Sequence, residues 1–243
     1  MAGKTAVLLG GTGQTGQKIL KELLQSPDFT KVGEYGRRVT DAAAITTGKD
    51  KLVQKKIDFE KLGEAGLKDD KWDVVFIALG TTRKAAGSAE NFEKIDREYV
   101  INAAREAKAD NPDQRLVYIS STGANPSSIF LYPRSKGLTE NGLAALGYSD
   151  TIIFRPAFLV GTQRPERENF LISAVTPIVG LAARFSDKMQ IDISTLAKSA
   201  VTAGRLGSSA LPPSACARKE GKDGATFTVI DNPGAIALAA EAS

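Results

Sequence analysis

Tyr132 and Lys136 are the first residues with a clear chemical use, because a phenol and an ammonium stand four positions apart. On a helix this spacing places both side chains on one face. A hydroxyl precedes them, at Ser121 or its neighbour Ser120, directly after the apolar run 116–119. An ordinary tyrosine has a pKa of about 10, and a nearby ammonium lowers it by stabilising the phenolate. Such a set can protonate a carbonyl oxygen while a hydride adds to the carbon.

We therefore predict that Ser121, Tyr132 and Lys136 are catalytic, and that Tyr132 and Lys136 also contact a cofactor. The hydroxyl would bond the carbonyl oxygen, the phenol would donate the proton, and the ammonium would hold ribose hydroxyls. Such a pair also arises by chance on a solvated helix surface. The position of the serines favours a catalytic role. They end a predicted strand, and parallel sheets bind ligands at the carboxyl ends of their strands.

A glycine-rich turn near the N-terminus is the second motif. Gly10, Gly13 and Gly16 separate the apolar run 6–9 from a helix-patterned segment at 14–25. A pyrophosphate needs such a turn, because it offers backbone amides and lies at the positive end of a helix. The alternative is a plain structural turn, since the spacing alone is a weak signal. The predicted dinucleotide site also includes Thr12, Gln14 and Thr15.

The end of the predicted second strand, 32–35, indicates which dinucleotide is bound. A site for NAD places Asp or Glu there to accept hydrogen bonds from the ribose 2′-hydroxyl. Here Arg37 and Arg38 follow Gly36. Arginine suits the 2′-phosphate of NADP(H), because its fixed fork of donors stays charged. The alternative is a solvated pair of charges, and we predict NADP(H) as the cofactor.

Three further segments follow predicted strands and are assigned to the same site. An acid that closes the third strand can bond the adenine amino group, while its neighbour flanks the ring. Residues after the fourth strand can lie against ribose and phosphates. A proline shortly after the apolar run 152–154 can expose backbone groups to the nicotinamide carboxamide, or can simply end a strand. These predicted contacts are Asp58, Phe59, Leu79, Gly80, Thr81, Thr82, Arg155, Pro156 and Ala157.

Short apolar runs alternate with helix-patterned segments along the chain, which is typical of βαβ units and a parallel sheet. Strands are predicted at 6–9, 32–35, 51–58, 73–79, 116–120, 151–160 and 227–230. Helices are predicted at 14–25, 90–107, 132–146, 170–185, 196–206 and after Pro233. The pattern predicts an α/β fold, a Rossmann-type doubly wound parallel sheet with a small C-terminal extension on the substrate side.

Residues 1–243 are interpreted as one NAD(P)-binding Rossmann domain without internal repeats. Residues 1–165 would form the cofactor-binding core, and 166–243 the C-terminal part on the substrate side. The apolar segment 170–185 is interpreted as a lid over the substrate, with a dimer face and a peripheral membrane contact as alternatives. A proline and an arginine interrupt it, so no transmembrane segment is predicted.

Composition narrows the chemistry further. The chain has no histidine, which excludes histidine bases and removes the usual zinc ligands, so no metal is predicted. One cysteine, Cys216, excludes an intrachain disulfide and fits a reducing compartment. The net charge of +4 comes from 32 basic and 28 acidic residues interleaved along the chain, so no nucleic-acid partner is predicted.

The motifs together resemble those of atypical short-chain dehydrogenases/reductases, and more narrowly the HIV Tat-interacting protein family and its fungal mitochondrial relatives. The resembling stretches are LLGGTGQTG, YGRR, IDFEKL, ALGTTRKAAG, KIDREYV, YISSTGANPSSIFLYPRSKG and FRPAFLVG. The resemblance implies NADPH beside Arg37 and Arg38, the serine–tyrosine–lysine active site, and attachment to the mitochondrial outer membrane. Leu138 departs from the family pattern, which has an acid after the glycine of YPRSKG.

We therefore expect an NADP(H)-dependent oxidoreductase that reduces a small carbonyl substrate. The alternative is an NADPH-sensing regulatory protein that binds other proteins with little turnover, peripheral to the mitochondrial outer membrane. The expected location is cytoplasmic, because no signal peptide is evident, with the cytosolic face of that membrane as the alternative. Monomer and homodimer both fit the sequence.

Overall fold

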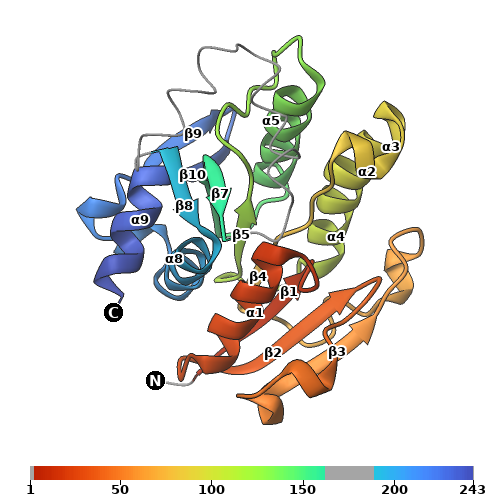
Figure 1. The fold of residues 1–243 in the computed structure, drawn as a ribbon, viewed down its shortest axis with the longest axis vertical. Helices are drawn as coiled ribbons and strands as arrows, with labels where there is room; N and C mark the ends of the chain where they lie inside the picture. The colour runs from red at the N-terminus through yellow and green to blue at the C-terminus, as the bar shows by residue number, and fades with distance from the viewer. Residues whose placement is uncertain (1–2, 162–188, 243) are drawn as a thin grey trace.

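The computed structural model describes residues 3–161 and 189–242 of the chain. Its centre is an eight-stranded sheet in the order β3-β2-β1-β4-β5-β6-β10-β9 (Figure 1). Neighbouring strands run parallel except at one edge, where β9 pairs antiparallel with β10. These strands are β1 (Lys4–Leu9), β2 (Phe29–Gly36), β3 (Leu52–Lys56), β4 (Val74–Ile77), β5 (Arg115–Ile119), β6 (Asp150–Arg155), β9 (Arg218–Lys222) and β10 (Ala225–Asp231). The predicted Rossmann-type α/β fold is confirmed.

Helices cover both faces of this sheet. They are α1 (Gln14–Gln25), α2 (Arg83–Ala86), α3 (Ala89–Glu93), α4 (Tyr99–Ala107), α5 (Leu131–Ala144), α8 (Ile193–Leu206) and α9 (Asn232–Glu241). α1, α8 and α9 pack on one face, and α4 and α5 pack on the other (Figure 1). Short 3₁₀ turns join the elements: η1 (Ala42–Ala44), η2 (Lys49–Lys51), η3 (Leu62–Glu64), η7 (Ser208–Ala210) and η8 (Pro213–Ala215).

The side chains of β1 show how the core is divided. Ala6 and Leu8 belong to the cluster under α1, α8 and α9, whereas Val7 and Leu9 belong to the cluster under α4 and α5. Successive side chains of a strand point to opposite faces, and both faces of this sheet are covered. A continuous apolar run is therefore what the central strand requires.

The strand order contains a switch point beside β1. The chain moves outward from β1 through β2 to β3, then crosses back to place β4 on the other side of β1. Connections after β1 and β4 consequently leave the sheet toward opposite faces, and a crevice opens between them at the carboxyl ends of the strands. The predicted site residues come from the segments that follow β1, β2, β3, β4, β5 and β6.

The predicted continuous helix 90–107 is wrong in its middle. α3 passes into a π-helical turn, η4 (Lys94–Glu98), before α4 begins. A π turn holds more residues than an α turn and changes which side chains face inward. Asp96 and Val100 are therefore buried, four positions apart, whereas an α-helical pattern places Ile95 inward and Ile95 is partly exposed.

The predicted strand 151–160 is divided into two. Pro156 has no backbone N–H to continue the ladder, so β6 ends at Arg155. The chain resumes as β7 (Phe158–Val160), which pairs with β8 (Gln190–Asp192) in a separate two-stranded sheet. β8 and β9 had no strand prediction, because one is three residues long and the other is mostly charged.

The predicted helix 170–185 lies outside the described residues, so its three interpretations stay predictions. Within residues 3–161 and 189–242, no helix is long and apolar enough to cross a bilayer. Residues 189–242 supply β9 and β10, which belong to the same sheet as the N-terminal strands. They also supply α8 and α9, which pack on that sheet.

Candidate active site

The glycine-rich turn connects β1 directly to α1. Gly10 has a φ of +95°, a conformation open to glycine, and a Cβ there would lie 2.8 Å from the Ala78 carbonyl. A Cβ on Gly16 would lie 2.0 Å from the Gly10 carbonyl oxygen, so helix and turn pack without side chains between them. Gly13 caps α1 without a side-chain hydrogen bond. The first amides of α1 therefore point from a bare helix N-terminus, as an anion site requires.

The other predicted residues of the turn lie beside it. Thr12, Gln14 and Thr15 are all partly exposed, so their side chains border solvent next to the helix N-terminus. Gln17 donates from its side-chain amide to the Thr12 carbonyl at 3.2 Å, which fixes the backbone of the turn.

Arg37 and Arg38 follow β2, and both residues are exposed. Neither forms an ion pair with another residue that the structure describes. A buried acid lies inside β2 instead. The Glu34 carboxylate accepts from the Thr40 amide at 3.0 Å, the Thr40 hydroxyl at 2.7 Å and the Gln54 side chain at 2.7 Å. Sequence reasoning missed Glu34, although an acid inside a buried strand is itself a signal.

Asp58 and Phe59 lie after β3, at the same edge. Asp58 is exposed and its carboxylate accepts from the Glu60 amide. Phe59 is buried and stacks on Tyr99, with ring centroids 5.3 Å apart. The pKa of Tyr99 is raised, chiefly by its hydrogen bond to the Glu60 carboxylate, and the charges of Lys94 and Arg37 oppose this shift. Arg37 thus lies near the Tyr99 side of the site.

The segment after β4 lies against the start of α2 and against Lys136. Leu79 packs partly on the core below α4 and α5. Thr82 caps α2 by accepting from the Ala85 amide at 3.1 Å, and the Thr81 hydroxyl contacts the Thr82 carbonyl at 3.4 Å. A Cβ on Gly80 would lie 3.8 Å from the Lys136 ammonium. Only a residue without a side chain leaves that space open.

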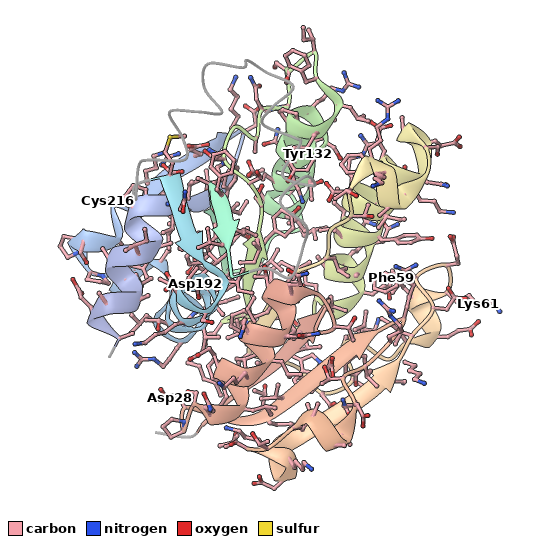
Figure 2. The ribbon with its side chains drawn as sticks, in the orientation of Figure 1. Asp28, Phe59, Lys61, Tyr132, Asp192 and Cys216 are labelled. Atoms are coloured by element: carbon pink, nitrogen blue, oxygen red, sulfur yellow. The ribbon has the colours of Figure 1, made fainter. Side chains whose placement is uncertain are left out.

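Tyr132 and Lys136 lie in the first two turns of α5. Figure 2 shows Tyr132 on this helix. Tyr132 is partly exposed and packs beside Phe92, with ring centroids 6.0 Å apart. Lys136 is buried, and its ammonium lies 5.8 Å from the centre of the Tyr132 ring. It donates to Asp96 at 3.0 Å and to the Tyr118 hydroxyl at 3.0 Å. The predicted pair therefore shares one helix face, over two buried partners that sequence reasoning missed.

Electrostatics keep this lysine charged. Burial alone lowers the pKa of Lys136, but the Asp96 carboxylate and the two tyrosines Tyr118 and Tyr132 reverse that effect and raise the pKa well above its ordinary value. Burial also raises the pKa of Tyr118, against the opposing charge of Lys136. An ammonium and a neutral phenol consequently coexist below Tyr132.

The two adjacent serines differ in their hydrogen bonds. Ser120 is buried, and its hydroxyl donates to the Glu140 carboxylate at 2.6 Å. Ser121 is partly exposed, and its hydroxyl makes a long 3.3 Å contact with the Thr122 carbonyl. The hydroxyl that can turn to a ligand without breaking a buried bond to a carboxylate is that of Ser121.

Arg155 is held by two carboxylates, from Glu140 at 2.6 Å and Glu220 at 2.9 Å. The neighbouring backbone groups are also engaged, because the Pro156 carbonyl accepts from the Thr122 amide and the Ala157 amide donates to the Asn232 side chain. The segment 155–157 thus lies beside the serines, and its predicted contact with nicotinamide stays a prediction.

Solved structures share the fold of this chain. The UDP-N-acetylglucosamine 4-epimerase from Methanobrevibacter ruminantium superposes with a TM-score of 0.61 at 18% identity, covering 85% of this chain and 74% of the epimerase. The Bordetella bronchiseptica enzyme WbmH, solved with NAD⁺, gives a TM-score of 0.60 at 20% identity over 84% and 72% of the two chains. At these identities the likeness establishes the fold alone.

Sequence relatives are more similar. Protein FMP52-1, mitochondrial, from Scheffersomyces stipitis is 41% identical over 165 residues, which are 67% of this chain and 70% of the relative. Protein fmp52, mitochondrial, from Aspergillus fumigatus is 36% identical over 203 residues, 81% and 85% of the two chains. Protein HTATIP2 from Rattus norvegicus is 37% identical over 167 residues, 69% and 67% of the two chains.

The fungal names correct one expectation. A cytoplasmic location was expected from the lack of an evident signal peptide, and it is wrong, because the fungal relatives are mitochondrial proteins by name. Cysteine content indicates the redox conditions around a protein, and these conditions do not identify its compartment.

The family itself follows from the extent of the match. Residues 10–180 match the NAD(P)H-binding family, from the first glycine of the turn through the tyrosine–lysine helix. The chain therefore belongs to the NAD(P)H-binding family, and the HTATIP2 and FMP52 proteins are among its relatives.

Proposed function

We propose that this protein is an NADP(H)-dependent oxidoreductase that reduces a small carbonyl substrate with Ser121, Tyr132 and Lys136. The observation that carries the proposal is the arrangement on α5, where a partly exposed Tyr132 lies over a Lys136 ammonium fixed by Asp96. A proton donor at the surface of the site and a fixed positive charge beneath it are what carbonyl reduction requires.

The residues around the crevice fit a dinucleotide. Gly10 and Gly16 close the turn on the helix without side chains, and the uncapped start of α1 presents amides for a pyrophosphate. Gly80 leaves space beside Lys136, where a ribose hydroxyl can accept from the ammonium. When bound, the reduced nicotinamide supplies a hydride to the carbonyl carbon.

Each side chain then has one task. The Ser121 hydroxyl donates to the substrate carbonyl oxygen and orients it. As the carbon receives hydride, the electron pair of the C=O bond moves to oxygen, and the Tyr132 hydroxyl gives that oxygen its proton. The Lys136 ammonium stabilises the resulting phenolate. Because Tyr132 is partly exposed, water can return the proton to it.

The preference for NADP(H) rests on the residues at the end of β2. Gly36 ends the strand, and Arg37 and Arg38 follow as exposed cations. The Glu34 carboxylate already accepts from Thr40 and Gln54, so it is occupied and does not replace the acid of an NAD site.

The test compares wild type with Tyr132→Phe. NADPH oxidation is followed against a panel of aldehydes, ketones and quinones, and NADPH binding is measured separately. We expect turnover of one class by the wild type and its collapse in the variant, with NADPH affinity unchanged. If the wild type binds NADPH tightly but shows no turnover that Tyr132→Phe abolishes, the reductase proposal is refuted and the second candidate remains.

The second candidate is an NADPH-responsive protein that binds other proteins. It is favoured by an apolar pair at the start of α5, where Ile129 is 85% exposed and Phe130 56% exposed, close to Tyr132 in the chain. A bound cofactor could change how this pair is presented to a partner. We also propose an association with mitochondria, which the names of the fungal relatives support and which fractionation of cells tests.

A further inference from the structure

Tyr118 is a buried phenol that has no task yet in the proposed chemistry. It lies in β5, shortly before Ser121, and packs in the core under α4 and α5, whereas Val117 packs on the other side of the sheet. Its hydroxyl accepts from the Lys136 ammonium at 3.0 Å. A polar oxygen in a packed core costs free energy unless it is hydrogen-bonded. Lys136 is the partner that the described residues give this oxygen, so the hydroxyl is placed to act on the lysine.

The Lys136 ammonium has three N–H donors. The Asp96 carboxylate accepts from one of them at 3.0 Å, and the Tyr118 oxygen accepts from a second at 3.0 Å. These acceptors come from different elements, the π turn η4 and the strand β5, so they fix the ammonium from two sides. Among the described residues, one donor of Lys136 is therefore left for a ligand.

Gly80 leaves space next to this ammonium. A Cβ at that position would lie 3.8 Å from Lys136 Nζ and 3.5 Å from Asp96 Oδ1. Gly80 follows β4, at the carboxyl edge of the sheet where the crevice opens. Tyr132 lies near the same ammonium, with its ring centre 5.8 Å from Nζ. The remaining donor is thus close both to the crevice and to the proposed proton donor.

We propose that Tyr118 is a positioning residue for the reduction, which holds the Lys136 ammonium beneath Tyr132 and leaves it one donor for the cofactor. This inference rests on the proposed oxidoreductase function. Without the Tyr118 oxygen, Asp96 is the acceptor that the described residues still offer, and its charge draws the ammonium toward it and away from Tyr132. Because Coulomb attraction weakens with distance, the lysine then stabilises the phenolate of Tyr132 less.

The oxygen of Tyr118 can be removed without its ring. The ring centre lies 5.3 Å from Lys136 Nζ, within the range of a cation–π contact, and Tyr118→Phe keeps this contact and the packing of the core. Tyr148→Phe is the matched control. Its hydroxyl is also a buried donor in the core under α4 and α5, but it bonds the Ala104 carbonyl rather than the lysine.

The first measurement is the NMR signal of the Lys136 ammonium nitrogen in the protein without cofactor, assigned by its loss in Lys136→Arg. An ammonium that is buried and bonded on two sides exchanges its protons slowly and gives a resolved signal. We expect Tyr118→Phe to abolish the slow exchange and Tyr148→Phe to leave it intact. An unchanged signal in Tyr118→Phe, or no slowly exchanging signal in the wild type, would overturn the inference.

The second measurement separates binding from turnover. Tyr118→Phe should raise the Kd of NADPH, measured from the fluorescence of the reduced nicotinamide, about three- to tenfold, because the ammonium is no longer held in place before the cofactor arrives. It should also lower kcat about tenfold or more, with KM for the carbonyl compound nearly unchanged.

Thermal unfolding of both variants shows that they are folded, and Tyr148→Phe should leave Kd and kcat unchanged. Equal losses of NADPH affinity and kcat in the two variants would make Tyr118 a structural residue and overturn the inference. A wild type that binds NADPH but reduces no carbonyl compound would instead refute the proposed function, while the ammonium signal and the Kd still test the placement of Lys136.

Discussion

The Lys136 ammonium lies 3.0 Å from a carboxylate oxygen of Asp96, and both side chains are buried. The pair joins α5 to the π turn before α4, so the residue proposed for catalysis also ties two helices together. The second carboxylate oxygen of Asp96 has no hydrogen-bond partner among the described residues. Each of the two buried side chains therefore relies on the other for its counter-charge.

Removing one charge of this pair should destabilise the fold. Asp96→Asn leaves a buried ammonium without its counter-charge, and we expect the free energy of unfolding to fall by about 3–5 kcal/mol. Urea denaturation measures the loss. Glu93→Gln, which breaks the partly exposed pair with Arg97 on the adjoining turn, should lower it by less than about 1 kcal/mol. Similar small losses in both variants would contradict this account.

Alkaline pH should unfold the protein through its buried tyrosines. Burial raises the pKa of Tyr118 and Tyr148 above the ordinary value of 10.0, so these phenols keep their protons in the folded state. Above that pH the unfolded chain holds fewer protons, and stability falls as pH rises. The raised pKa of Lys136 acts in the same direction above its ordinary 10.5.

Tyr118→Phe tests this dependence, because it removes one of the titrating groups. The slope of unfolding free energy against pH above 10 should become shallower by up to about 1.4 kcal/mol per pH unit. Urea denaturation across the alkaline range gives the slope, and phenolate absorbance reports ionisation. An unchanged slope would show that Tyr118 ionises without unfolding.

Substitutions of the two adjacent serines should have different effects, one on turnover and the other on stability. Ser121→Ala removes the proposed donor to the substrate oxygen and should lower kcat by about 10²–10³. Ser120→Ala removes one of the hydrogen bonds that the buried Glu140 carboxylate accepts, beside those from Arg155, and should lower the unfolding free energy by about 1–3 kcal/mol, with kcat largely retained. Steady-state kinetics and chemical denaturation of both variants decide the assignment, and the reverse pattern would make Ser120 the catalytic hydroxyl.

A single methyl group should damage the glycine turn. Gly16→Ala places a carbon 2.0 Å from the Gly10 carbonyl oxygen, so turn and helix must separate. We expect a loss of about 1–3 kcal/mol in stability and a large loss of NADPH affinity. Gly63→Ala, where no atom lies within 4 Å of the added carbon, is the control. Calorimetric titration and thermal unfolding measure both, and an unaffected Gly16→Ala would refute the close packing.

The architecture could be predicted because its signals are local. The apolar run of β1, the glycines after it and the helix pattern of α1 occur within the first 25 residues. Most of the later strands and helices of the central sheet then follow from periodicity, and the order of elements implies a parallel sheet. The placement of Tyr132 and Lys136 on one helix face follows from their spacing in the same way.

Three of the missed residues share one property, because Glu34, Asp96 and Glu140 are all buried carboxylates. Acids are ordinarily exposed, so a sequence assigns them to the surface unless their partners are known. Those partners, Thr40 and Lys136 among them, meet them only in the folded chain. The π turn was missed for a related reason, since its widened spacing differs from an α-helix by a single residue.

The two outer strands of the sheet have a consequence for how copies of this protein meet. β3 carries Lys55 and Lys56, and β9 reads Arg-Lys-Glu-Gly-Lys, so both open edges present charged side chains. Like charges oppose an incoming strand from a second molecule, although free N–H and C=O groups would otherwise invite it. Edge-to-edge pairing through β3 or β9, and with it fibril-like growth of the central sheet, is thereby discouraged.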